Sequence, residues 1–132
     1  MKIIRVAIMF AVIFGLVATA GVSLAVDISD KAEIKGAMKE YVKAHTDDGG
    51  KLPVVYQGEV LMLELRKSKK YPDGFHPGIV SKGGLFASCS DFTDPKTKKN
   101  YDIDFLVSKV GDEYIVEQPI VHKVDGVILF RF

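Results

Sequence analysis

Apolar and polar side chains alternate along residues 83–124, as expected for strands that bury one face and expose the other. Two groups of turn-forming residues interrupt this alternation. Asp94 and Pro95 lie in the first group, where Pro favours the second position of a type I turn. Gly111 and Asp112 form the second group. We therefore predict three antiparallel strands joined by two short turns.

The register of these strands follows from their apolar positions. Pairing Asp91 with Tyr101 keeps the apolar side chains of the first two strands on one face, and across the second turn Val107 then meets Tyr114. The buried face is expected to carry Leu85, Ala87, Cys89, Ile103, Phe105, Val107, Tyr114 and Val116. The outer face is expected to carry Ser88, Ser90, Asp102 and Asp104. A slip of one residue would turn every side chain over, so agreement between the two hairpins supports this register.

Residues 30–46 have the spacing of an amphipathic helix. Ile34, Met38, Tyr41 and Val42 recur at intervals of three and four, which places them on one helical face. Asp30 stands three residues before a glutamate, as in a capping box. A single helix with an apolar face must cover another apolar surface, and in so short a chain that surface is the sheet.

The remaining segments extend the sheet. Residues 51–67 predict a long strand, interrupted at Gln57 and Gly58, and residues 68–84 predict a loop. Asp125 and Gly126 form a two-residue turn before a last strand at 127–132. The expected fold is therefore α+β, with one N-terminal helix packed on a curved antiparallel meander of about four or five strands.

Residues 1–25 have the layout of a secretory signal peptide. Lys2 and Arg5 precede an uncharged apolar run, and Ser23-Leu24-Ala25 resembles a cleavage site. The alternative is an uncleaved membrane anchor, because the apolar run approaches the length that spans a bilayer. Cleavage leaves residues 26–132 as a single α+β domain. The protein is then expected to be exported, to a periplasm or the extracellular space.

Charge and cysteine content exclude several classes of protein. The chain has 18 Lys and Arg, and loss of Lys2 and Arg5 leaves 16 basic against 17 acidic residues. Such a balance offers no basic surface for nucleic acid. Cys89 is the single cysteine, so an exported domain must be stabilised by packing without an intramolecular disulfide.

In its order of elements, a helix followed by a meander, the chain resembles cystatin-like and NTF2-like domains. The resemblance implies a concave sheet and a helix that enclose a pocket, in folds that include inhibitors, ligand-binding proteins and some enzymes. Cystatin inhibitors carry a Q-x-V-x-G hairpin. Residues 57–61 read Gln-Gly-Glu-Val-Leu, which lacks both that spacing and the final glycine.

Two polar groups are candidates for chemistry on the sheet. Cys89 could act as a nucleophile if a base lay within about 3 Å, but the predicted register separates it from His122 by on the order of 16 Å. An inert core cysteine is therefore expected. Asp102 and Asp104 could bind Ca²⁺ or act as an acid and base, but no calcium-binding loop motif is present and a solvated strand face is the favoured explanation. We predict no catalytic residue, no metal site and no cofactor.

A pocket between helix and sheet is expected to bind a ligand through Tyr41, Tyr101, Gln118 and His122. The facing of Gln118 and His122 assumes an unbroken strand, and a bulge at Pro119 would reverse it. On the outer face, Phe86, Leu106 and Ile115 fall in one apolar row. That row predicts either a covering segment, such as residues 68–84, or an interface with a partner.

Three functions remain open at this stage. The first is a non-catalytic envelope domain that binds a small apolar ligand or a protein partner in the helix-covered pocket. The second is a pocket enzyme of NTF2-like type that uses His122 with a nearby carboxylate. The third is an interaction or inhibitor module that acts through the outer sheet face. The chain is expected to be a monomer or a homodimer, and to contact a membrane only if its N-terminal segment is uncleaved.

Overall fold

The structure is a computed structural model that describes residues 26–131. The predicted signal peptide or anchor, residues 1–25, lies outside the described residues. Among residues 26–131, no helix combines the length and the apolar character needed to cross a membrane.

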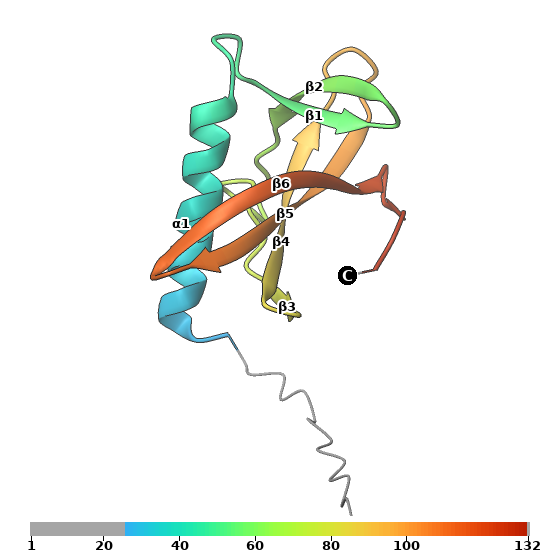
Figure 1. The fold of residues 1–132 in the computed structure, drawn as a ribbon. Helices are drawn as coiled ribbons and strands as arrows, with labels where there is room; N and C mark the ends of the chain where they lie inside the picture. Colours follow the sequence, from blue (N-terminus) through green and yellow to red (C-terminus); the bar gives the residue numbers. More distant parts are fainter. Residues whose placement is uncertain (1–25, 132) are drawn as a thin grey trace, which may run out of the picture.

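One helix is followed by seven strands (Figure 1). These elements are α1 (Ile28–His45), β1 (Lys51–Tyr56), β2 (Glu59–Leu65), β3 (Val80–Lys82), β4 (Leu85–Thr93), β5 (Asn100–Val110), β6 (Glu113–Val124) and β7 (Val127–Ile128). They form one sheet in the order β1-β2-β4-β5-β6-β7, with β3 paired to β4. Every pairing is antiparallel. The predicted α+β class is therefore confirmed.

The sheet has seven strands, so the predicted number of four or five was too low. The predicted long strand at 51–67 is a hairpin, because Gln57 and Gly58 both adopt positive φ and close a tight turn between β1 and β2. The short strand β3 lies in the segment predicted as loop. The predicted last strand at 127–132 is limited to the two residues of β7.

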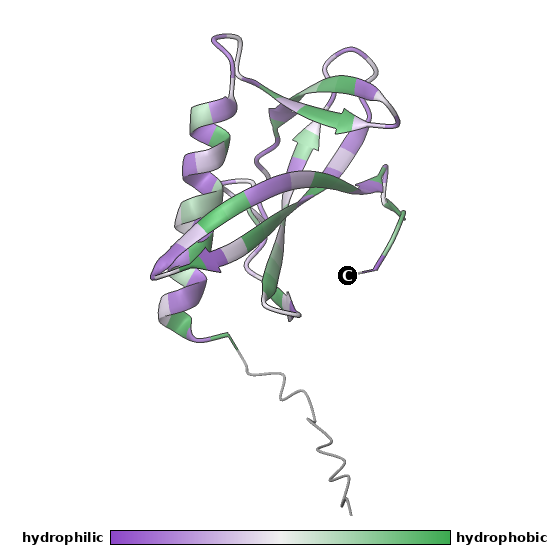
Figure 2. Cartoon of the chain, viewed as in Figure 1, coloured by the Kyte–Doolittle hydropathy of each residue, from purple (hydrophilic) through white to green (hydrophobic). Residues whose placement is uncertain are grey.

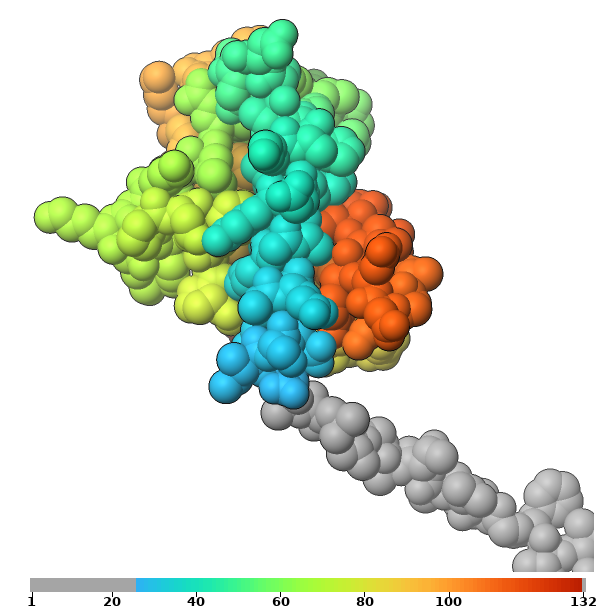
Figure 3. Space-filling model, turned by 90° about the vertical axis from the view of Figure 1, so that its left-hand side faces the viewer, coloured from blue at the N-terminus to red at the C-terminus, as the bar shows by residue number. Residues whose placement is uncertain are grey.

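The N-cap of helix α1 is Asp27, three residues before the predicted cap Asp30. The carboxylate of Asp27 accepts a hydrogen bond from the amide of Ile28 at 2.6 Å, while Asp30 lies within the first turn. Ile34, Met38 and Val42 are buried, as the helical periodicity predicted. In Figure 3 the helix runs down one face of the molecule, between the yellow-green chain before β4 and the orange-red β6.

The space between helix and sheet is filled by the hydrophobic core. Met38 and Ile34 pack there with Phe92, Phe105 and Leu63, all at 0% exposure. Apolar and hydrophilic segments alternate along β6, which contributes one face to this core (Figure 2). The expected helix-covered ligand pocket is therefore occupied by packed side chains.

The predicted register between β4 and β5 was wrong by one residue. Asp91 pairs with Asp102, and Phe92 pairs with Tyr101. The predicted facing of β5 is correct, since Tyr101, Ile103, Phe105 and Val107 are all buried. On β4 the faces are exchanged: Phe86, Ser88, Ser90 and Phe92 lie on the helix side, and Leu85, Ala87, Cys89 and Asp91 lie on the outer side.

Buried serines explain why alternation gave the wrong facing for β4. The hydroxyl of Ser90 donates to the carbonyl of Gly74 at 2.9 Å, and that of Ser88 donates to the carbonyl of Gly78 at 2.6 Å. These bonds offset the cost of removing a hydroxyl from water. The large Phe92 side chain, at 0% exposure, can then occupy the core in place of Cys89.

Two bulges interrupt the pairing of β6 with β5. The register shifts between Leu106 and Val107, where Glu117 is the extra residue, and between Asp102 and Ile103, where His122 is the extra residue. Val107 pairs with Val116, two residues beyond the predicted partner. The alternative of a bulge near Pro119 therefore describes the strand better than an unbroken one, because Gln118 pairs with Leu106 on the outer face.

Candidate functional site

The outer face of the sheet brings together titratable side chains from three strands. Cys89 on β4 lies directly opposite Asp104 on β5. His122, the extra residue of the second bulge in β6, reaches the same place. We call Cys89, Asp104 and His122 the thiol cluster.

Three different donor atoms converge in the thiol cluster. The Cys89 thiol donates to Asp104 Oδ1 at 2.9 Å, and Asp104 Oδ1 lies 3.1 Å from His122 Nδ1. Cys89 Sγ lies 3.9 Å from the same ring nitrogen. The Asp104 side chain is 4% exposed and that of His122 is 17% exposed. The cluster therefore combines sulfur, oxygen and nitrogen in a largely buried place.

The chemistry of Cys89 follows from its burial and from its carboxylate neighbour. Burial raises the pKa of the Cys89 thiol to about 12, and the hydrogen bond to Asp104 acts in the same direction. At neutral pH the thiol is protonated, and a protonated thiol is a poor nucleophile. The arrangement therefore does not activate Cys89 for covalent catalysis.

The expected distance of on the order of 16 Å between Cys89 and His122 was wrong, since Cys89 Sγ and His122 Nδ1 lie 3.9 Å apart. The shifted register turns Cys89 outward, and the bulge brings His122 toward it. Cys89 is half-buried on the outer face. Asp104 is 3% exposed, so the expected solvated strand face is wrong at this position.

A pair of carboxylates lies beside the thiol cluster. Asp91 and Asp102 are direct cross-strand partners, an arrangement that like charges make unfavourable. Basic groups surround them: His76 Nε2 lies 2.8 Å from Asp91 Oδ1, Arg66 Nη2 lies 3.8 Å from Asp91 Oδ2, and Lys123 Nζ lies 3.3 Å from Asp102 Oδ2. This second group is thus an ion-pair network with its own counter-charges.

The chain before β3 is bound along the free edge of β4. The amide of His76 donates to the carbonyl of Cys89 at 3.0 Å, and the amide of Asp91 donates to that of Gly74 at 2.9 Å. The His76 ring stacks on Tyr71 with 4.0 Å between centroids. These contacts hold residues 71–80 at the β4 border of the outer face, and Ile115 of the row that this segment was expected to cover is still 41% exposed.

Lys35 connects this segment to the helix. Its ammonium donates to the carbonyl of His76 and to the hydroxyl of Ser88. Burial lowers the pKa of Lys35 to about 8, because the charged form loses hydration. The helix therefore contributes a cationic side chain near the edge of the thiol cluster, although its apolar face lies in the core.

A pocket of about 630 Å³, which we call the outer-face pocket, opens beside the thiol cluster. Cys89, Asp104 and His122 form part of its lining, together with Lys123 and Arg131. The other lining residues are Tyr71, His76, Pro77, Gly78, Ile79, Val80, Ala87, Ser88 and Ile128. The pocket thus has apolar walls and a small polar end, which is the composition typical of small-molecule sites.

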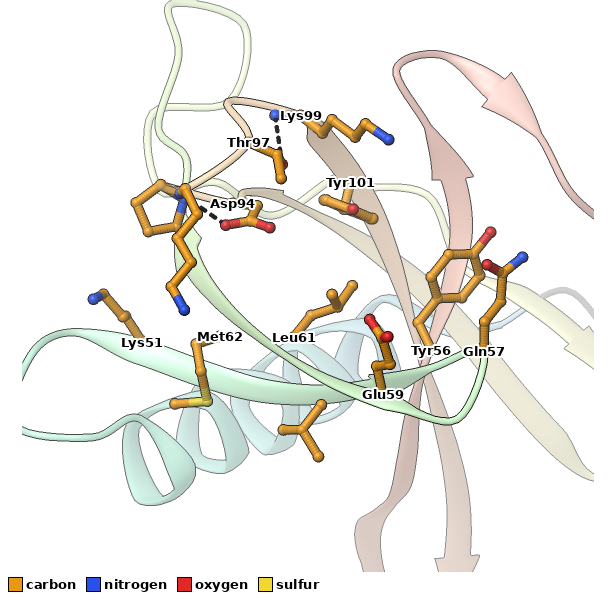
Figure 4. Close-up of a pocket in the computed structure, with 13 residues that line it drawn as sticks. Lys51, Tyr56, Gln57, Glu59, Leu61, Met62, Asp94, Thr97, Lys99 and Tyr101 are labelled. Atoms are coloured by element: carbon orange, nitrogen blue, oxygen red, sulfur yellow. Dashed lines mark hydrogen bonds between the residues drawn. The ribbon is translucent and has the colours of Figure 1, made fainter.

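A second pocket, of about 480 Å³, lies between the β1–β2 hairpin and the turn after β4 (Figure 4). Tyr101, Tyr56 and Leu61 line it together with Asp94 and Lys99. The two groups of possible metal-binding side chains found among residues 26–131 both lie elsewhere. The residues that line this second pocket therefore suggest no particular chemistry.

The structure does not bring the four predicted ligand-binding residues together. Tyr41 packs on Phe105 from the helix, and the buried Tyr101 lines the second pocket. Gln118 is exposed on the outer face, and His122 lines the first pocket. Of these four residues, only His122 belongs to the thiol cluster.

The predicted apolar row of Phe86, Leu106 and Ile115 does not form. Phe86 is on the helix side, where its ring packs against Tyr114 at 5.5 Å between centroids. Leu106 is half-buried on the outer face opposite Gln118, and Ile115 is 41% exposed opposite Ser108. Two register differences are the reason: the shift of β4 moves Phe86 to the other face, and the pairing of β5 with β6 places Gln118, not Ile115, opposite Leu106.

Sequence reasoning named Cys89, Asp104 and His122 separately but missed their contact, and it missed Lys35 and His76 as neighbours. A one-residue shift and a bulge decide that contact. The sequence signal for the correct facing of β4 is the large Phe92, whose burial in the core is more favourable than that of the small Cys89.

Neither a protein family, nor a curated protein, nor a solved structure matches this chain. The resemblance to cystatin-like and NTF2-like domains therefore stays a prediction.

Proposed function

We propose that this protein is an exported, non-catalytic domain that binds a small ligand in the outer-face pocket. The ligand has an apolar body, which contacts Ile79, Val80 and Ile128, and a polar end, which contacts His122 and Asp104. The observation that carries this proposal is a pocket of about 630 Å³ whose apolar walls converge on a few buried polar groups.

Two further features support binding at this place. Val80 is 51% exposed and Ile128 is 44% exposed, so apolar surface is available for a ligand to cover. Arg131 lines the pocket, and its guanidinium suits a ligand with an acceptor group. The polar end is held in place by cross-strand contacts, which reduces the entropy lost on binding.

Native mass spectrometry of the protein, expressed as the full chain and purified gently, tests this proposal. We expect a bound mass that disappears on denaturation. The variant Val80→Glu places a carboxylate in the apolar wall, so it should lose the bound mass. Val55→Glu is the matched control, because Val55 is 69% exposed on β1 and lines neither pocket.

A bound mass retained in Val80→Glu would place the ligand elsewhere, and a wild-type protein that binds nothing from lysate or a metabolite library would contradict the proposal. The same spectra read the mass of the mature chain. They therefore also test the predicted cleavage near residue 25, which decides between a released domain and a membrane-anchored one.

A second candidate function is acid–base catalysis in the same pocket. The observation that favours it is the contact of His122 Nδ1 with Asp104 Oδ1 at 3.1 Å, since a carboxylate on one ring nitrogen orients the other toward a substrate. A hydrolase or isomerase activity with a bell-shaped pH profile, abolished in His122→Ala and retained in His45→Ala, would support this candidate. An activity unchanged in His122→Ala would exclude it.

A further inference from the structure

The thiol cluster has the size of a metal coordination triangle. A tetrahedral Zn²⁺ with bonds of about 2.0–2.3 Å separates its ligand atoms by roughly 3.2–3.7 Å. In the structure the three separations are 2.9, 3.1 and 3.9 Å. Small side-chain rotations therefore suffice to place all three atoms around one ion.

The donor types select the kind of ion. A thiolate sulfur and an imidazole nitrogen favour borderline metals such as Zn²⁺, whereas Ca²⁺ and Mg²⁺ require mainly oxygen ligands. The three residues come from three adjacent strands, β4, β5 and β6, so the sheet fixes their relative positions. The backbone of His122 is fixed as well, because its carbonyl accepts a hydrogen bond from the amide of Leu129 at 2.9 Å.

The charge of the cluster also favours a cation. Asp104 is 3% exposed, and among residues 26–131 the one basic side chain within ion-pair distance of it is the His122 ring. The neighbouring carboxylates differ, since Arg66, His76 and Lys123 already surround Asp91 and Asp102. Lys35 lies at the edge of the thiol cluster, where its ammonium donates to Ser88, but among residues 26–131 no lysine or arginine forms an ion pair with Asp104. The thiol cluster therefore combines a soft donor with a buried carboxylate that no lysine or arginine pairs.

We propose that Cys89, Asp104 and His122 bind a divalent ion of the zinc class, with the fourth coordination position open to the outer-face pocket. Binding replaces the proton of the Cys89 thiol by the metal, and that proton passes to solvent. Three protein ligands with an open position are typical of zinc sites that bind a further molecule. The inference rests on the proposed pocket only for the occupant of that fourth position.

Titration of the metal-free protein with Co²⁺ and with Zn²⁺ tests this proposal without any small ligand. A Co²⁺–thiolate bond gives a near-ultraviolet charge-transfer band, and Cys89 is the single cysteine of the chain. We expect that band in the wild type, with about one Zn²⁺ bound per chain by calorimetry. The band should disappear in Cys89→Ser, and its absence in the wild type would overturn the proposal whether or not any variant folds.

Variants of the other two ligands complete the test. Asp104→Asn and His122→Gln should each weaken Zn²⁺ binding by more than about 100-fold, whereas His45→Gln at the end of α1 should leave it unchanged. Equal affinity in wild type, Asp104→Asn and His122→Gln would overturn the proposal. Val80→Glu distinguishes it from the proposed function, because that variant should lose the small ligand and keep the cobalt band.

Discussion

At the scale of single residues, the position of one carboxylate decides what its neighbours can do. Asp104 lies between the Cys89 thiol and the His122 ring, at 2.9 Å from the sulfur and 3.1 Å from the nitrogen. In a nucleophilic dyad the imidazole would take the thiol proton. Here the carboxylate accepts that hydrogen bond, so the thiol keeps its proton until a metal ion or strong base removes it.

Alkylation of Cys89 measures this effect directly. Because its pKa is raised from 9.0 to about 12, we expect the native protein at pH 9 to react with iodoacetamide at least about 100-fold more slowly than the urea-unfolded protein. The native rate should keep rising with pH beyond 10. In Asp104→Asn the rise should begin at lower pH, because the negative charge is lost.

A native alkylation rate that levels off near pH 8 would contradict this reading of the cluster. The unfolded protein serves as the internal control, since Cys89 is then free of both burial and Asp104. The experiment is done without added metal, so that only the proton competes for the sulfur.

At the scale of elements, Gly74 determines the backbone conformation of the segment before β3. Gly74 has a φ of +83°, and a Cβ there would lie 2.8 Å from Leu65 Cδ1 and 3.0 Å from the carbonyl oxygen of Arg66. Its own carbonyl accepts hydrogen bonds from Ser90 and from the amide of Asp91. A residue with a side chain at this position would move the acceptor that allows Ser90 to be buried.

We therefore expect Gly74→Ala to lower the free energy of unfolding by about 2 to 4 kcal/mol, since it combines positive-φ strain with a steric clash. Urea unfolding followed by circular dichroism measures the change. Gly78→Ala is the matched control from the same segment, because a Cβ at Gly78 meets nothing within 4 Å. Equal stability of the two variants would show that the segment is not held by Gly74.

The elements also show how far the sequence could predict this molecule. The helix, the facing of β5, and the turns at Gly111 and Asp125 could be predicted, since each depends on local spacing or turn chemistry. Alternation alone gave the wrong facing for β4, because the correct one buries Ser88 and Ser90 against carbonyls of a distant loop, and the size of Phe92 was the one local signal for it. The thiol cluster depends on that facing and on a bulge at His122, so it was beyond local patterns.

At the scale of the whole molecule, Lys35 links the helix, the covering segment and the sheet. Its ammonium donates to the His76 carbonyl and to the Ser88 hydroxyl, and burial lowers its pKa from 10.5 to about 8. Between these two values the unfolded chain binds more protons at this residue than the folded chain. The contribution of Lys35 to stability therefore rises as the pH increases from about 8 to 10.5.

Comparison of the wild type with Lys35→Met tests this linkage. The difference in free energy of unfolding, wild type minus variant, should increase between pH 7.5 and pH 9.5 by on the order of 1 kcal/mol, allowing for the partial exposure of the ammonium. Other titrating groups are present in both proteins, so their contributions cancel. Lys43→Met, which changes an exposed lysine of the same helix, is the control. A difference that stays constant or falls with pH would mean that Lys35 is not desolvated.

Deletion of one or the other extra residue of the two β6 bulges would have opposite effects on the thiol cluster. Loss of the codon for Glu117 would remove the first bulge while every other side chain keeps its face, so a related sequence one residue shorter there would retain the bulge at His122 and the cluster. Loss of the codon for His122 would remove the second bulge in the same way, but the imidazole would be lost with it. The outer-face chemistry thus depends on one surplus residue in an otherwise ordinary strand, and insertions and deletions in β6 would record when a lineage acquired or lost it.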